Sequence, residues 1–525
     1  MAAHTLITSC YQNIPADMGL FMADIDFARR LHRQDMVLWW SIGTKPDLGG
    51  SEQDQHSQQV EENLLPQVSV PGCYSNAVLE VTIDDLAINA ILQSAIVNEM
   101  EGSGSGSMAF DSASHNLDEY AKGSAHTAAT LGDAVLPTQT FAILKSMVRT
   151  WWTGHARAKV GKRKTNVTDL AVNHFWRWLS SSTSAMYDPA LQRFLYSLMR
   201  KVFLQLLAEF KRLGTQVIYA DFNRVFLLTS KPDATSAYAF AQYLVTAATS
   251  QELFQDISFE ISQFWNYLAW MDVANFGGVK ISATDAGNPR AIITDTITMD
   301  WNIQAYLPPG IQPYFETQVG NFIFAMYSAK KKSSDGRTPL KAIHDLTNNS
   351  TTDAPAPTQV NPAKLKEAAA AQASISHQLT RRLLSIVSKL KKRHSAAATD
   401  PTEADLLRFP LLPGQVSTPT NPTLEFIKSV CAVFGLAKEY SVEVQILKRN
   451  LLDLVNIREF AEEALFKNPC GQPLVLPMVI CAKCFSCRDV DLCRDPDRLP
   501  VVTPEKKGLE ILAPMRESWA CQVSS

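Results

Sequence analysis

The chain has 525 residues and a mass of 58.1 kDa, which gives room for roughly two to four domains and a large core. Hydrophobic residues make up 46% and charged residues 19%, so the composition excludes a wholly disordered protein. Basic and acidic residues nearly balance, at 49 against 52. This balance excludes DNA binding along the whole surface and limits any nucleic-acid contact to a local patch.

The N-terminal segment lacks the basic region and apolar stretch of a signal peptide. No apolar run approaches the ~18 residues that a membrane-spanning helix needs, so we expect no membrane partner. The nucleus or the cytosol is therefore the expected compartment. Two basic runs, 162–164 and 389–393, are of the kind that serves nuclear import, although most such runs are ordinary solvated surface.

Changes of composition divide the chain into four predicted parts. A mixed α/β body covers 1–329 and contains a Ser/Ala/Gly-rich insertion at about 101–131. Residues 330–364, rich in Lys, Ser, Thr, Asn and Pro, are the predicted linker. A mostly helical region follows at 365–470, and a cysteine-rich tail occupies 471–525.

A basic segment at 149–164 contains no acidic residue and includes Trp151 and Trp152. Basic residues interleaved with aromatic ones can track and stack on DNA. The favoured interpretation is a solvated insertion, with the tryptophans packed under the preceding helix. The histidines, His155 among them, show no catalytic or metal-ligand spacing and are interpreted as polar surface. The residues of the candidate nucleic-acid patch are Arg157, Lys159, Lys162, Arg163 and Lys164.

A long helix followed by a β-hairpin is predicted next. Apolar residues recur at three- and four-residue spacing through 190–213, after a capping Asp188 and Pro189, and Gly214 ends the pattern. Two β-branched and aromatic runs, 216–219 and 224–229, flank a short turn.

Further along the chain, an aromatic-rich segment is predicted to be part of the core. Its aromatic and leucine residues are interpreted as one face of a helix: Phe264, Trp265, Leu268 and Trp270. Gly277 and Gly278 form an isolated pair, and no glycine-rich phosphate loop is present.

The hairpin tip carries an aspartate, and several polymerases hold catalytic magnesium between two carboxylates at such a tip. The sequence from Tyr219 to Arg224, Tyr-Ala-Asp-Phe-Asn-Arg, resembles the Tyr-Gly-Asp-Thr-Asp-Ser of the B-family DNA polymerase palm. Asp221 is retained, but Asn223 replaces the second carboxylate and Arg224 adds a positive charge. A site of this composition should bind Mg²⁺ poorly.

Other segments resemble the C-terminal half of the DNA polymerase epsilon catalytic subunits, which are B-family DNA polymerases. In that family this half is a degenerate module, and the active DNA-directed DNA polymerase (a nucleotidyltransferase) lies in the N-terminal half. The resemblance implies a degenerate polymerase-like palm, a helical thumb-like region and a small zinc-binding tail. The matching segments are 27–30, 38–41, 46–50, 71–74, 206–214, 270–272, 311–316, 449–452 and 487–495.

The resemblance also implies partners and a setting. They are the polymerase epsilon B subunit, other polymerase subunits and the replicative helicase complex, in nuclear DNA replication, with DNA contacted directly or through these partners. We interpret the chain as a non-catalytic scaffold and as part of a longer subunit.

A second metal position is also altered. Residues 86–89 resemble the Leu-Tyr-Pro-Ser of the family's first metal motif, and that register places Thr82 where the aspartate belongs. Asp84 and Asp85 are nearby, but their spacing on a strand changes the face or depth. We therefore predict no catalytic residues, with Tyr219, Asp221 and Asn223 as a vestigial motif and Asp221 as a turn residue. The alternative is an active polymerase in which Asp221, Asp84 and Asp85 hold metal.

Five of the nine cysteines lie in the last 45 residues. Cys481 and Cys484 have the spacing of one corner of a zinc knuckle. Cys521 resembles the start of the second pair, where Ser524 stands in place of the fourth thiolate. A zinc site is predicted, with Cys487 or Cys493 as candidate fourth ligands. Unliganded surface thiols and a [4Fe–4S] cluster are the less favoured interpretations.

Overall fold

A computed structural model gives the fold of much of the chain. The predicted insertion at 101–131, most of the predicted linker and the tail cysteines Cys481, Cys484, Cys493 and Cys521 lie outside the residues that it describes. Those residues are 18–36, 68–100, 138–160, 167–181, 184–282, 296–335, 372–397, 400–410, 419–469, 475–480 and 487–491.

The chain divides into two compact units, each assembled from separated segments. Unit 1 comprises Met1–Val68, Val81–Phe226 and Phe240–Ile261, and unit 2 comprises Ser69–Glu80, Leu227–Ala239 and Ser262–Ser525. The predicted division into a 1–329 body, a linker and a helical region remains a prediction. Residues 330–335, assigned to the linker, form the end of helix α13 (Gln312–Asp335).

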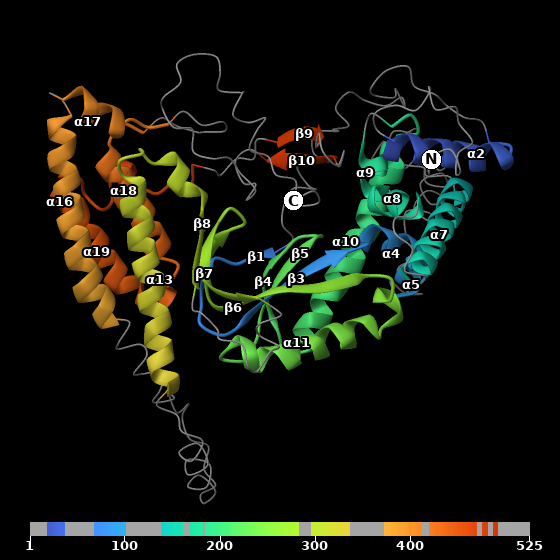
Figure 1. Cartoon of the computed structure of the whole chain (residues 1–525), viewed down its shortest axis with the longest axis horizontal. Coiled ribbons are helices and arrows are strands. Elements are labelled where there is room, and N and C mark those ends of the chain that lie inside the picture. Colours follow the sequence, from blue (N-terminus) through green and yellow to red (C-terminus); the bar gives the residue numbers. More distant parts are fainter. Residues whose placement is uncertain are drawn as a thin grey trace, which may run out of the picture. The chain divides into compact units, whose positions relative to one another are not determined.

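The described strands and helices confirm a mixed helix-and-sheet fold (Figure 1). Hydrogen-bonded strands follow the order β1-β4-β5-β3-β6-β7-β8, and β2 pairs with β6. The strands are β1 (Val68–Ser69), β2 (Gly72–Tyr74), β3 (Val78–Asp84), β4 (Gln216–Ala220), β5 (Arg224–Leu228), β6 (Ser258–Asp272), β7 (Asn275–Ser282) and β8 (Thr296–Trp301).

Helices make up most of unit 1. Their buried indoles are held by aspartates: Asp26 accepts a hydrogen bond from Trp151 Nε1 at 2.9 Å, and Asp24 accepts one from Trp178 Nε1 at 2.8 Å. None of the described helices in the chain combines the length and apolar character needed to cross a bilayer. The unit 1 helices are α2 (Met18–Arg33), α4 (Leu86–Leu92), α5 (Ser94–Met100), α7 (Thr138–Val160), α8 (Val167–Asn173), α9 (Phe175–Ser180) and α10 (Pro189–Arg212); α11 (Ala234–Thr249) has residues in both units.

The aromatic segment predicted as a helix face is a strand, so that prediction was wrong. Phe264 to Trp270 lie on β6, where seven consecutive residues are buried, and β6 pairs antiparallel with β7. A continuous apolar run without alternation is compatible with either element, which explains the error. Gly278 pairs with Leu268, next to a shift of register between Trp265 and Tyr267, and a Cβ at Gly278 would collide with the carbonyl oxygen of Tyr267. The glycine is therefore required by close approach of two strands.

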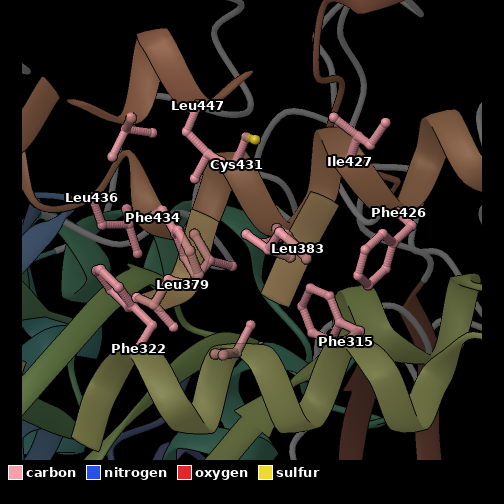
Figure 2. Packing of buried hydrophobic residues seen from close by; sticks show 14 of the residues in the cluster. Phe315, Phe322, Leu379, Leu383, Phe426, Ile427, Cys431, Phe434, Leu436 and Leu447 are labelled. Atoms are coloured by element: carbon pink, nitrogen blue, oxygen red, sulfur yellow. The ribbon is translucent and has the colours of Figure 1, made fainter. Parts of the chain in front are cut away.

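A helical core lies in unit 2, where helical structure was predicted. Figure 2 shows Phe315 and Phe322 of α13 pointing toward side chains from α16 and α18. The rings of Phe322 and Phe434 stack with centroids 4.3 Å apart, and both side chains are fully buried. The helices concerned are α13, the π-helical turn η4 (Ser374–Leu379), α16 (Thr380–Ala396), α17 (Pro401–Leu406), α18 (Pro422–Phe434) and α19 (Ser441–Leu454).

The remaining elements of unit 2 are short. A two-stranded antiparallel sheet joins β9 (Val475–Ile480) to β10 (Cys487–Asp491). Single turns of helix occur at η3 (Asn302–Tyr306), η5 (Lys438–Tyr440) and η6 (Glu462–Ala464), and η2 (Glu252–Phe254) is the corresponding turn of unit 1.

Replacing Phe322 with alanine tests this core. Because the ring is fully buried and stacked, Phe322→Ala should lower the free energy of unfolding by about 3–5 kcal/mol. Phe324 lies two residues away on α13 with 56% of its surface exposed, and Phe324→Ala should change it by less than about 0.5 kcal/mol. Denaturant unfolding followed by circular dichroism measures both, and equal losses would contradict the packing described.

Candidate functional site: the β4–β5 hairpin

The hairpin predicted from the sequence is present. Helix α10 ends at Arg212, Gly214 takes a positive φ of 93°, and β4 and β5 follow. Positive φ is easily adopted only by glycine among the common residues, so Gly214 reverses the chain between helix and strand. The predicted helix and both predicted strands agree with the observed ones to within one residue.

Asp221 forms the turn between the two strands with its own carboxylate. Its Oδ1 accepts hydrogen bonds from the backbone N–H groups of Asn223 at 2.8 Å and Arg224 at 2.6 Å. Its Oδ2 accepts a hydrogen bond from the Tyr219 hydroxyl at 2.7 Å. A carboxylate that accepts hydrogen bonds from the backbone in this way stabilises the turn.

The Tyr219 hydroxyl contact was not predicted. Side chains two residues apart on a strand lie on the same face, and that spacing is the signal that could have revealed it. Tyr219 is buried, and burial followed by the nearby negative charge of Asp221 raises the pKa of its hydroxyl. Tyr219 therefore remains a neutral hydrogen-bond donor at physiological pH.

Arg224 places a positive charge at the start of β5. Its guanidinium carbon lies 6.0 Å from the centre of the Tyr219 ring and 5.6 Å from that of Phe226, within the range of cation–π contacts. In the B-family palm motif, the position of Arg224 follows the second carboxylate, and here that carboxylate position is the neutral Asn223. A cation at this place disfavours a second one, because like charges repel.

The end of β3 lies beside the hairpin, because the N–H of Ile83 donates to the carbonyl oxygen of Asn223 at 2.7 Å. Asp84 ends β3 and is exposed; Asp85 adopts φ 66° and accepts a hydrogen bond from Ser258 Oγ at 3.1 Å. The fold thus brings Asp84, Asp85 and Asp221 to one end of neighbouring strands. However, no group of three or more His, Cys, Asp or Glu side chains in the described part of the chain is arranged to hold a metal ion.

The segment that resembles the family's first metal motif, residues 82–89, makes structural contacts in this fold. Thr82 lies within β3, and Asn89 of the following α4 is fully buried. Asn89 Nδ2 donates to the carbonyl oxygen of Leu253 at 2.9 Å, and its Oδ1 accepts from the N–H of Asp256 at 3.2 Å. This motif therefore joins backbone segments within unit 1.

The basic segment divides into a packed helix and residues outside the described part. Trp151 is buried, and Trp152 Nε1 donates to Asp256 at 2.8 Å, so both indoles have roles inside unit 1. Arg157 is exposed on α7, where Lys159 also lies, and Lys162, Arg163 and Lys164 fall outside the described residues. A DNA-binding role for this patch remains a prediction.

His155, interpreted as polar surface, is instead buried, and that interpretation was wrong. It is 9% exposed, its Nδ1 lies 2.6 Å from Asp169 Oδ1, and its ring stacks on Trp152. The carboxylate on the next helix provides the polar partner that a buried imidazole needs. This pair joins α7 to α8.

The cysteine tail is described only in part. Strands β9 and β10 pair antiparallel with Ile480 opposite Cys487, so the chain reverses between these two residues. Cys481-x-x-Cys484 falls between the two strands in the sequence, and two thiolates at this spacing are suited to one corner of a zinc knuckle. The donor types and the reversal fit zinc.

Two family models match the chain. The first, "Domain of unknown function (DUF1744)", matches residues 3–279, and the second, "Zinc finger domain of DNA polymerase-epsilon", matches residues 463–523. The chain belongs to the DUF1744 family, whose model covers more than half of its residues.

Curated relatives identify the larger protein to which this region corresponds. The DNA polymerase epsilon catalytic subunit of Emericella nidulans is 34% identical over 93% of this chain and 21% of its own length. That of Schizosaccharomyces pombe is 31% identical over 99% of this chain and 22% of its own length. The chain therefore spans about a fifth of these relatives and corresponds to their C-terminal region. The predicted resemblance is confirmed.

A solved structure of the family B DNA polymerase from Pyrobaculum calidifontis is also similar. It is 12% identical, with a TM-score of 0.31, and the match covers 75% of this chain and 41% of that one. Because the TM-score is low, the palm-like and thumb-like assignments remain predictions.

Substitution of Asp221 separates a turn role from a metal role. Asp221→Ala removes three hydrogen bonds to a charged acceptor and should lower the free energy of unfolding by about 1–3 kcal/mol. Asp221→Asn keeps an oxygen that accepts from the backbone N–H groups, so it should lower the free energy of unfolding less than Asp221→Ala does. The exposed Asp84 serves as a control, since Asp84→Ala should change it by less than about 0.5 kcal/mol.

The same unfolding measurement is repeated with Mg²⁺. A ligand that binds the folded state raises its stability by mass action. We expect no Mg²⁺-dependent rise in wild type. A rise that disappears in Asp221→Ala would show that Asp221 is a metal ligand.

Proposed function

We propose that this chain is a non-catalytic scaffold within DNA polymerase epsilon, acting in assembly of the leading-strand replisome during nuclear DNA replication. One observation carries the proposal: the retained carboxylate of the vestigial motif accepts three hydrogen bonds from its own hairpin. The relatives' names support a role in replication. The chain spans a fifth of their length, so the polymerase activity in their names does not have to be located in this region.

Phosphoryl transfer by this class of enzyme needs two metal ions held by converging carboxylates. In this hairpin the second carboxylate position is Asn223, and Arg224 follows it. Asp221 alone can neutralise only part of the charge of two divalent ions. We therefore propose that the hairpin contributes to the fold, while catalysis by the whole polymerase occurs elsewhere.

A scaffold of this kind needs stable surfaces more than a reactive site. The stacked phenylalanines of the unit 2 core and the strand pairing of β6 and β7 stabilise the fold that carries such surfaces, without any metal at the hairpin. We propose the polymerase epsilon B subunit, other polymerase subunits and the replicative helicase complex as the partners. The match to the zinc finger domain of DNA polymerase-epsilon supports the polymerase-complex part of this proposal.

We propose that the tail binds one Zn²⁺ through Cys481, Cys484, Cys521 and either Cys487 or Cys493. When bound, zinc would cross-link the tail and stabilise a small unit that has little core of its own. The β9–β10 reversal supports this arrangement because it brings Ile480 and Cys487 into register on either side of the Cys-x-x-Cys pair.

Primer extension tests the scaffold proposal. Purified chain, given a primed template, deoxynucleotides and either Mg²⁺ or Mn²⁺, should extend no primer above the enzyme-free background, and Asp221→Ala should behave identically. A full-length DNA polymerase epsilon serves as the active control. Extension by this chain that is abolished by Asp221→Ala would overturn the proposal and establish an active polymerase with an irregular metal site.

Metal analysis tests the zinc tail. Wild-type chain should hold about one zinc per molecule, and Cys481→Ser, Cys484→Ser or Cys521→Ser should each lower the zinc content, because a thiolate ligand is lost. Cys10→Ser makes the same chemical change outside the zinc-finger match and should leave the content unchanged. Comparison of Cys487→Ser with Cys493→Ser identifies the fourth ligand. Iron with acid-labile sulfide, or no metal at all, would contradict the zinc site.

A further inference from the structure

Helix α16 concentrates positive charge in a chain that is otherwise nearly balanced. Its 17 residues include six lysines and arginines and no aspartate or glutamate. The whole chain has 49 basic and 52 acidic residues, so this helix is a strong local departure from the average. Because the overall charge is balanced, a polyanion could bind only at a local basic patch, and helix α16 is such a patch.

The basic side chains of α16 lie away from its buried face. Leu383, Val387 and Leu390 are buried in the unit 2 core, where α16 lies beside α18 and α19 (Figure 1). At 3.6 residues per turn, the four exposed basic residues occupy an arc of about 100° and a length of about 16 Å. We name this surface the α16 basic face; its residues are Arg381, Arg382, Lys389 and Lys392, with the exposed Ser385 between them.

Two other basic residues of α16 are used within the fold. Arg393 forms an ion pair with Glu403 of α17, with Nη2 2.9 Å from Oε2. Lys391 Nζ donates to the carbonyl oxygen of Leu454 at the end of α19 at 2.6 Å. By contrast, no ion-pair partner for the four residues of the basic face occurs among the described residues. Their charge is therefore not neutralised by the part of the fold that the structure describes.

The composition of this face favours a phosphate polymer over a membrane. An amphipathic helix that binds a bilayer needs exposed apolar residues, and the fully buried apolar residues of α16 are part of the core. No aromatic residue lies on the exposed face, so base stacking is absent from its chemistry. What remains is a group of exposed positive charges on one side of a helix, which suits contact with phosphates.

We propose that the α16 basic face binds the phosphate backbone of double-stranded DNA. Its length of about 16 Å equals the axial rise of roughly five base pairs at about 3.4 Å each, so several backbone phosphates of a duplex lie within reach of the four side chains. The contact would be independent of base sequence and would add DNA binding to the proposed scaffold function. The choice of DNA among polyanions rests on the proposed replication role, whereas the location on α16 rests only on the structure.

Fluorescence anisotropy with a labelled 30-base-pair duplex tests the proposal at several salt concentrations. The test variant is Arg381→Gln/Arg382→Gln/Lys389→Gln/Lys392→Gln. The matched control removes four exposed positive charges from other elements: Lys211→Gln/Lys231→Gln/Lys438→Gln/Arg458→Gln. Both variants alter only exposed side chains, and circular dichroism checks that each keeps the wild-type helix content and melting temperature.

Four phosphate contacts predict a slope of log K against log salt of about −3.6, so wild-type affinity should fall about 150-fold between 50 and 200 mM salt. In the test variant the magnitude of this slope should be smaller by about three to four, about one for each side chain replaced. The control should keep the wild-type slope. Equal slopes for wild type and test variant, or no duplex binding by wild type, would overturn the proposal. Equal losses in both variants would also overturn it, because the effect would then follow net charge alone. The primer-extension outcome is independent of all these results.

Discussion

The carboxylate of Asp221 closes the β4–β5 turn, and the chemistry open to this part of the chain depends on that use. A carboxylate has about four lone-pair positions, and three hydrogen bonds from the hairpin occupy most of them. The neighbouring Asn223 contributes no charge, and Arg224 contributes the opposite sign to the one a metal site needs. The hairpin is thus stable in itself and poorly suited to divalent ions.

The fold does not need a metal at this hairpin to persist. Burial of apolar surface is the main favourable contribution to folding, and the largest fully buried side chains lie on α9, α10, β5, η2, β6, α13 and α18. Such a core tolerates loss of charge at a surface turn, because the two contributions are separate. The buried core can therefore keep the structure ordered without a metal ion at the hairpin.

Local sequence signals predicted the elements near the hairpin well. The capping Asp188, the terminal Gly214 and the two β-branched runs defined α10, β4 and β5 because each signal acts within a few residues. Predictions from the sequence failed where contacts with another strand or helix determine the secondary structure or the burial of a residue. Phe264 to Trp270 form a strand because β7 pairs with it, and His155 is buried because Asp169 approaches it from another helix. β7 begins only three residues after β6 ends, and Asp169 lies 14 residues from His155, but the spacing of apolar side chains reports neither contact.

At the candidate site, too, some features could be predicted from the sequence and others could not. The neutral Asn223 was evident from the sequence, whereas the three hydrogen bonds to Asp221 are evident only in the folded hairpin. The most direct test of the central claim is anomalous diffraction from crystals of the chain soaked in Mn²⁺. The account predicts no manganese peak beside Asp221. A manganese peak bridging Asp221 and either Asp84 or Asp85 would contradict it.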